Sequence, residues 1–220
     1  MTQATSTSAH GEIGTPEEIA YEARAQEGAI WTGGRLWIGV MAFAYAALAF
    51  AYFYLRSSNS DTLWRPHNVT APTAWGAAIM AMMVGSAAVV VFGLRRLRAG
   101  MALDWTISWW CAVVGSLLAF AFQIWELTDL PFHPGASGYS SVFVAWAGMD
   151  LALIFSGFYW VETILARHLR LRRAARAQGV DEALLLADRM FRVNAESCAF
   201  YWGFIALVSV FFWVFFYLAS

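Results

Sequence analysis

The sequence predicts an all-α fold, an integral membrane bundle of five transmembrane helices. Hydrophobic residues make up 60% of the 220 residues and charged residues only 13%, and a water-soluble domain of this length would need an implausibly thick core to bury so much apolar surface. Five apolar segments, each close to the roughly 20 residues that cross a bilayer as a helix, explain this composition. They cover residues 36–55, 73–94, 105–127, 140–166 and 199–218.

Arginine, the only basic residue besides histidine, orients these helices. Twelve arginines precede the first segment or lie in the second and fourth connections, whereas only Arg56 and Arg65 follow the first segment. The positive-inside rule therefore places the N-terminus in the cytoplasm and the C-terminus outside. We expect a polar cytoplasmic tail over residues 1–30, a transmembrane domain over residues 31–220, and an arginine-rich cytoplasmic connection over residues 167–196. The absence of lysine is typical of a GC-rich bacterial genome and favours a bacterial plasma membrane.

Two short cytoplasmic helices are expected outside the membrane segments. The first begins at Thr15, with Pro16 in its first turn. The second lies within residues 180–193 and has Asp181 near its start. Arginines that continue the fourth segment into the cytoplasm predict contacts with anionic phospholipid head groups.

Small residues inside the membrane predict where the helices touch. They recur at every fourth position of the second, third and fourth segments, a spacing that lets two helix backbones approach closely in lipid. Glycines in these stripes are Gly85, Gly115 and Gly148.

Residues that could carry metal or redox chemistry are missing from the membrane segments. Haem or copper in a membrane bundle usually needs histidines that project from its helices, but the four histidines, His10, His67, His133 and His168, all lie in the tail or the connections. Cys111 and Cys198 occur in apolar runs without CxxC or Cys/His spacing, and we interpret both as packing residues. We therefore expect no cofactor, metal or catalytic site in this chain, and no nucleic-acid partner.

The acids of the apolar segments are the remaining candidates for function. Asp150 lies roughly 15–18 Å into the fourth segment, near the midplane of a ~30 Å hydrocarbon layer, where a charge must face protein and find a partner. Gln123 and Ser209 are plausible partners by residue type. Either a proton relay or a hydrogen bond that locks helices together would explain such an acid. Glu162 is about 120° around the same helix from Asp150, so the two do not line one face.

Several motifs, in order along the chain, resemble the third subunit of the haem–copper terminal oxidases. The resemblance covers about residues 36–218, and the chain is similar to the five-helix bacterial form of that subunit. The motifs are Ala51-Tyr-Phe-Tyr-Leu-Arg56, Gln123-Ile-Trp-Glu126, Gly138-Tyr-Ser-Ser, the stretch 143–148, and Glu196-Ser-Cys-Ala-Phe-Tyr-Trp-Gly-Phe. Polar residues usual in the family are replaced here by Met41, Asp150, Leu153, Gly203 and Ala206.

The resemblance implies a cofactor-free accessory subunit of a respiratory oxidase of the cytochrome c oxidase type. Its partners would be the catalytic subunit I, which holds the haem and copper, and subunit II, and its role would be to support proton uptake and stability during aerobic electron transport. An accessory subunit of a quinol oxidase or a nitric oxide reductase is the alternative within this class. A small transporter that uses Asp150 is the alternative from another class, although the sequence shows no inverted repeat. Our candidates for buried polar, lipid-contacting or packing roles are Gln123, Glu126, Asp150, Glu162, Arg192, Glu196 and Trp202.

Overall fold

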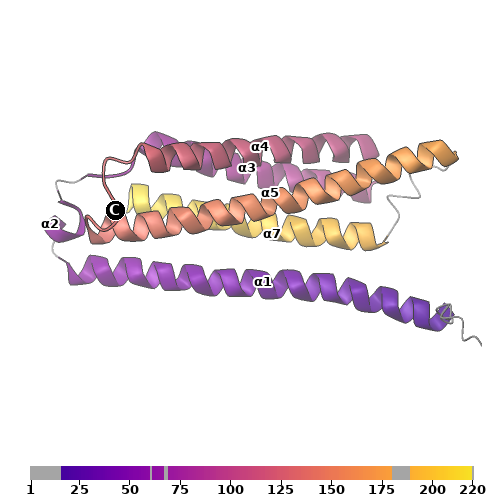
Figure 1. The fold of residues 1–220 in the computed structure, drawn as a ribbon, viewed down its shortest axis with the longest axis horizontal. Coiled ribbons are helices and arrows are strands. Elements are labelled where there is room, and N and C mark those ends of the chain that lie inside the picture. Colours follow the sequence, from indigo (N-terminus) through magenta and orange to yellow (C-terminus); the bar gives the residue numbers. More distant parts are fainter. Residues whose placement is uncertain (1–15, 60, 67–68, 180–188, 220) are drawn as a thin grey trace, which may run out of the picture.

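The computed structural model describes residues 16–59, 61–66, 69–179 and 189–219, and these residues form helices and connections without a strand. A four-residue helix, α2 (Asp61–Trp64), follows the first long helix. Five helices are long and apolar enough to cross a membrane (Figure 1), which confirms the all-α class and the predicted number of candidate spans. The long helices are α1 (Pro16–Ser58), α3 (Thr73–Arg98), α4 (Ala102–Thr128), α5 (Gly138–Gln178) and α7 (Arg189–Trp213), the last continuing into a π-helical turn, η2 (Val214–Leu218).

α1 differs from the expected short helix followed by a separate span, because it runs without a break from Pro16 to Ser58. Glycine in a helix costs only about 1 kcal/mol relative to alanine, so the glycines around residue 33 do not end it. Two contacts with α7 stabilise this stretch. Glu27 forms an ion pair with Arg189 at 2.9 Å, and the ring of Trp31 lies 6.4 Å from that of Phe200.

α5 has clear start and stop signals. Ser137 and Ser140 form a capping box at its N-terminus, and Gly179, with φ of 69°, ends it in the left-handed conformation that glycine adopts most easily. The arginine-rich stretch after residue 166 thus continues the helix, as the sequence predicts. The expected second short helix cannot be compared in full, because residues 180–188 lie outside the described residues, as do residues 1–15.

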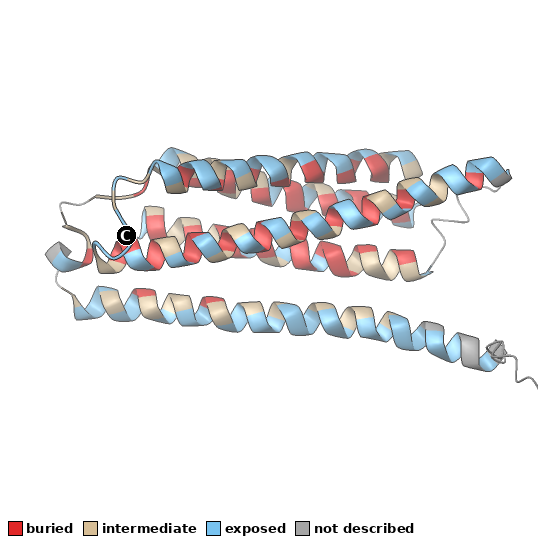
Figure 2. Cartoon of the chain, viewed as in Figure 1, coloured by how far each residue is buried: buried red, intermediate tan, exposed pale blue. Residues whose placement is uncertain are grey.

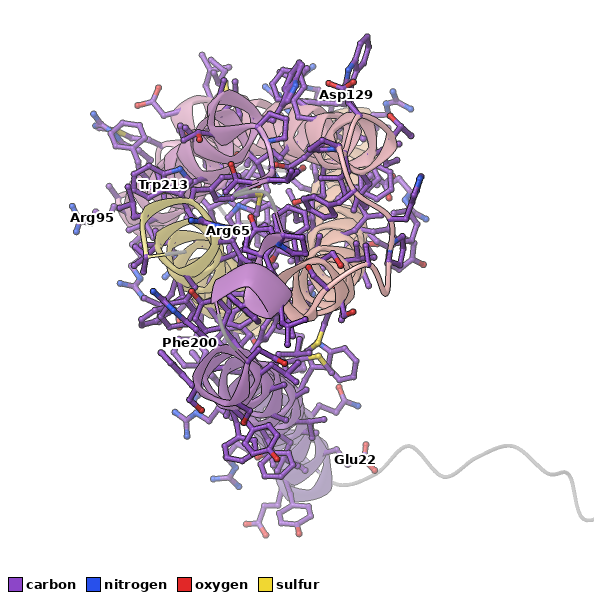
Figure 3. The ribbon with its side chains drawn as sticks, turned by 90° about the vertical axis from the view of Figure 1, so that its left-hand side faces the viewer. Glu22, Arg65, Arg95, Asp129, Phe200 and Trp213 are labelled. Atoms are coloured by element: carbon purple, nitrogen blue, oxygen red, sulfur yellow. The ribbon has the colours of Figure 1, made fainter. Side chains whose placement is uncertain are left out.

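The helices form a group of four with one helix set to the side. α3, α4, α5 and α7 pack together, and α1 packs on α5 and α7. Figure 3 looks along the bundle and shows α1 beside this group. The largest fully buried side chains include Trp105, Trp109 and Trp202. α1 is exposed over most of its surface (Figure 2), with large apolar side chains such as Phe43 and Phe50 among the exposed residues.

The small-residue stripes are only partly contact faces. Gly115 faces Ser86, so α3 and α4 do approach closely there. A Cβ added to Gly85 or Gly148 would instead meet nothing within 4 Å. α5 and α7 are in close contact at Gly157, where Trp202 covers the glycine.

The arginine asymmetry predicts a definite topology. Reporter fusions or cysteine labelling should place the N-terminus and the loop after Arg98 in the cytoplasm and Ser220 outside, since five spans leave the chain ends on opposite sides of the membrane. A cytoplasmic Ser220 would contradict the five-span arrangement.

Candidate functional site

Asp150, on α5, is fully buried. The hydroxyl of Tyr45, on α1, donates to Asp150 Oδ1 at 3.5 Å. Ser209, on α7, also lies next to this carboxyl, although Asp150 Oδ2 and Ser209 Oγ make no hydrogen bond of ordinary geometry within the described residues. The acid thus forms a hydrogen bond to α1 and has Ser209 of α7 beside it. Of the two partners suggested by residue type, only Ser209 lies next to Asp150.

A second polar cluster joins α4 to the C-terminal turn. Glu126 is buried, and Gln123 Nε2 donates to its Oε2 at 2.8 Å. The hydroxyl of Tyr217, on η2, donates to its Oε1. The Tyr217 ring lies directly over Gly76 of α3, where a Cβ would clash with it. Gln123 therefore belongs to Glu126 rather than to Asp150, and this cluster fixes the positions of three helix ends.

The remaining candidates lie apart from these two clusters. Glu162 is exposed on the surface of α5 rather than in the interior. Glu196 forms an ion pair with Arg98 at 2.8 Å, and Arg192 is half-buried near the start of α7. Trp202 is fully buried against Gly157. The acids singled out in the sequence are thus spread over separate places.

Sequence reasoning missed His168, which is buried instead of lying among solvated arginines. Its Nε2 is 3.3 Å from Thr106 Oγ1, and its ring packs on Trp105 at 4.6 Å. Val161, Leu165 and His168 are buried at helical spacing, so the apolar stripe of α5 continues through the histidine. That periodicity was the signal that could have located it.

Tyrosines make several further hydrogen bonds between helices. Tyr201 of α7 and Ser156 of α5 have their hydroxyls 2.5 Å apart. Tyr52 of α1 donates to the carbonyl of Phe215 at 2.9 Å. Tyr139 of α5 donates to the carbonyl of Phe216 at 3.1 Å. Buried hydroxyls satisfied by another helix hold helices in register, because the alternative is an unpaired polar group in an apolar medium.

Among the described residues, no group of three or more histidine, cysteine, aspartate or glutamate side chains converges on one point. No protein-family model matches the sequence, and a comparison with curated proteins finds no significant match.

Proposed function

We propose that this chain is a cofactor-free accessory subunit of a respiratory haem–copper oxidase in a bacterial plasma membrane. The observation that carries the proposal is the position of two residues that belong to the motifs of the resemblance. Gln123 and Glu126 close α4 in the motif similar to oxidase subunit III, and here both belong to the cluster that joins α4 to η2. Polar groups arranged in this way suit a rigid scaffold that supports a neighbour.

The outer surface suits a chain surrounded by lipid and protein. Large apolar side chains are exposed on every long helix, for example Phe43 on α1, Val84 on α3 and Phe155 on α5. Exposed arginines follow the inner end of the α5 span, among them Arg170 and Arg173, where they would meet anionic head groups. In this proposal the haem-bearing subunit I and subunit II cover part of the apolar surface, and phospholipids cover the rest.

Gentle detergent extraction of a tagged chain tests the proposal. The chain should co-purify with a haem-bearing membrane subunit, and the haem should stay with that subunit when the two are separated. A complex stripped of the chain should keep its haem spectrum and its first oxygen consumption. It should then lose activity faster over successive turnovers, most clearly at higher pH, where protons for uptake are scarce. Haem that remains on the isolated chain would contradict the accessory role.

The same extraction separates the alternatives. A quinol oxidase or a nitric oxide reductase as the co-purifying enzyme would keep the accessory role and change the complex. A chain that purifies alone, and that loses substrate uptake in vesicles when Asp150 is replaced, would favour the transporter.

A further inference from the structure

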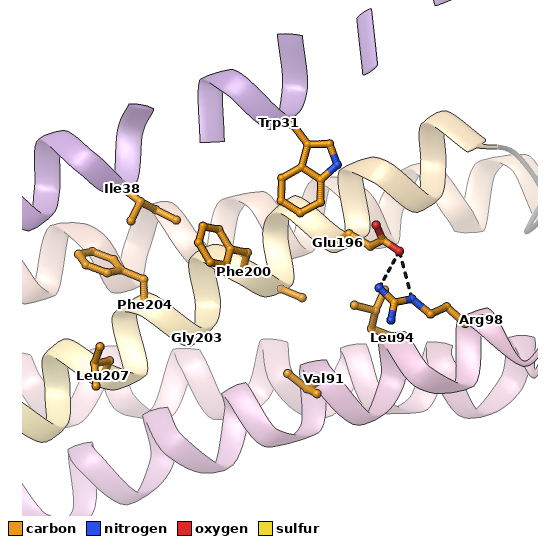
Figure 4. A pocket seen from close by; sticks show the side chains of 11 residues that line it. Trp31, Ile38, Val91, Leu94, Arg98, Glu196, Phe200, Gly203, Phe204 and Leu207 are labelled. Atoms are coloured by element: carbon orange, nitrogen blue, oxygen red, sulfur yellow. Dashed lines mark hydrogen bonds and ion pairs between the residues drawn. The ribbon is translucent and has the colours of Figure 1, made fainter. Parts of the chain in front are cut away.

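α1 and α3 stand apart on either side of α7, and the space between them is a groove of about 640 Å³. Small-molecule sites in proteins have volumes of this order. Phe200 and Leu207 are about half exposed on the α7 side of the groove, although α7 is otherwise the most buried of the five spans. Figure 4 shows the apolar lining, which includes Trp31, Ile38, Val91, Phe200, Phe204 and Leu207.

One end of the groove is polar. Arg98 Nη2 and Nε donate to Glu196 Oε1 at 2.8 and 3.1 Å, as the dashed lines in Figure 4 show. A guanidinium has five N–H donors and a carboxylate has two oxygens, so this pair can still donate to and accept from a ligand. Since the two charges offset each other, this end suits a polar group without net charge.

The apolar path is longer than one leaflet. From Glu196 to Leu207 along α7 is about 16 Å, roughly half of a ~30 Å hydrocarbon layer. A second cavity of about 270 Å³ begins at Phe204 and Leu207 and continues along α7 to Phe215, with Ala42 and Ala46 of α1 beside it. The whole path covers about 28 Å of helix, which is close to the full thickness of the layer.

We propose that this groove binds a membrane-soluble quinone or its quinol. The ring would lie at the polar end, where its carbonyl accepts from Arg98, the quinol hydroxyl donates to Glu196, and Trp31 and Phe200 offer aromatic faces. The single long isoprenoid tail would follow α7 through both cavities. A phospholipid fits less well, because each of its tails needs only one leaflet. The proposal concerns binding alone and involves no electron transfer within the chain.

The probe is a photoreactive ubiquinone analogue with a short isoprenoid tail, added to the full chain in phosphatidylcholine vesicles. Labelling should be saturable, should be competed by unlabelled ubiquinone, and should fall on peptides that contain residues 31–38 and 200–207. Gly203→Phe should reduce labelling about tenfold or more, because its ring would fill the groove. Gly148→Phe is the matched control, since a Cβ at either glycine meets nothing within 4 Å and Gly148 lies outside the groove lining. Both variants should elute from size exclusion like the parent chain.

Two further variants separate a quinone from an anionic lipid. Replacing Arg98 and Glu196 together by leucine removes both the donor and the acceptor and should weaken quinone labelling about tenfold to a hundredfold. Arg35, which lies 5.2 Å over the ring of Trp31, should be replaceable by glutamine without effect. Gly203→Phe labelled like the parent chain would overturn the proposal. So would labelling that phosphatidylglycerol competes as well as ubiquinone does and that Arg35→Gln weakens. These readings use the chain alone, so their outcome does not depend on the oxidase proposal.

Discussion

Replacement of Gly157 by leucine is expected to prevent α5 and α7 from packing and to abolish the folded chain. A Cβ at this position would lie 2.0 Å from Cζ3 of Trp202 and 2.9 Å from Cδ1 of Ile205. Both side chains are fully buried, so neither can turn away into free space. Overpacking by a single methyl group typically costs about 1–3 kcal/mol, and leucine adds three more carbons at the same point.

The matched control for this prediction is Gly148→Leu on the same helix. Gly148 is exposed, and a Cβ there meets nothing within 4 Å, so this variant should express and elute like the parent chain. Gly157→Ala should give an intermediate loss, measured as the detergent concentration at half-unfolding. Equal yields of folded chain from Gly157→Leu and Gly148→Leu would show that α5 and α7 do not meet at Gly157.

The number and order of the long helices could be predicted from the apolar runs of the sequence alone. A span needs about 20 apolar residues, and that requirement is local in the sequence. The ends of the helices were predicted less accurately, because their positions depend on contacts with other helices. Two contacts with α7 lie on the N-terminal side of residue 36, where the first span was predicted to begin. They are the ion pair of Glu27 with Arg189 and the contact of Trp31 with Phe200.

The partners of buried groups could not be predicted, because they depend on how each helix is rotated about its axis. The depth of Asp150 in an apolar segment predicts that it has a polar partner, but nothing in the neighbouring sequence identifies Tyr45, which is 105 residues away. The sequence likewise does not show which glycines face another helix. Gly148 belongs to a regular stripe and faces nothing, whereas Gly157 receives Trp202. Glu162, an acid near the inner end of the same helix, is on the exposed side.

Replacement of Asp150 by leucine is expected to impair assembly strongly, whereas Asp150→Asn should assemble like the parent chain. Leucine leaves the Tyr45 hydroxyl without its acceptor. Each buried polar group without a partner costs about 1–3 kcal/mol. Asparagine keeps a carbonyl oxygen that can accept from Tyr45. The fraction of chain recovered folded after detergent extraction measures the difference.

Glu162→Leu is the control, because it removes an acid from the exposed side of the same helix and should leave assembly unchanged. Tyr45→Phe should reproduce part of the leucine defect, since it removes the donor and keeps the ring between Trp146 and Phe204. The asparagine variant then separates the two roles open to Asp150. Asn and Leu variants that fail equally would show that assembly itself needs the carboxyl group. An asparagine variant that assembles while its complex no longer takes up protons would make Asp150 part of a relay, because only the titratable proton has been removed.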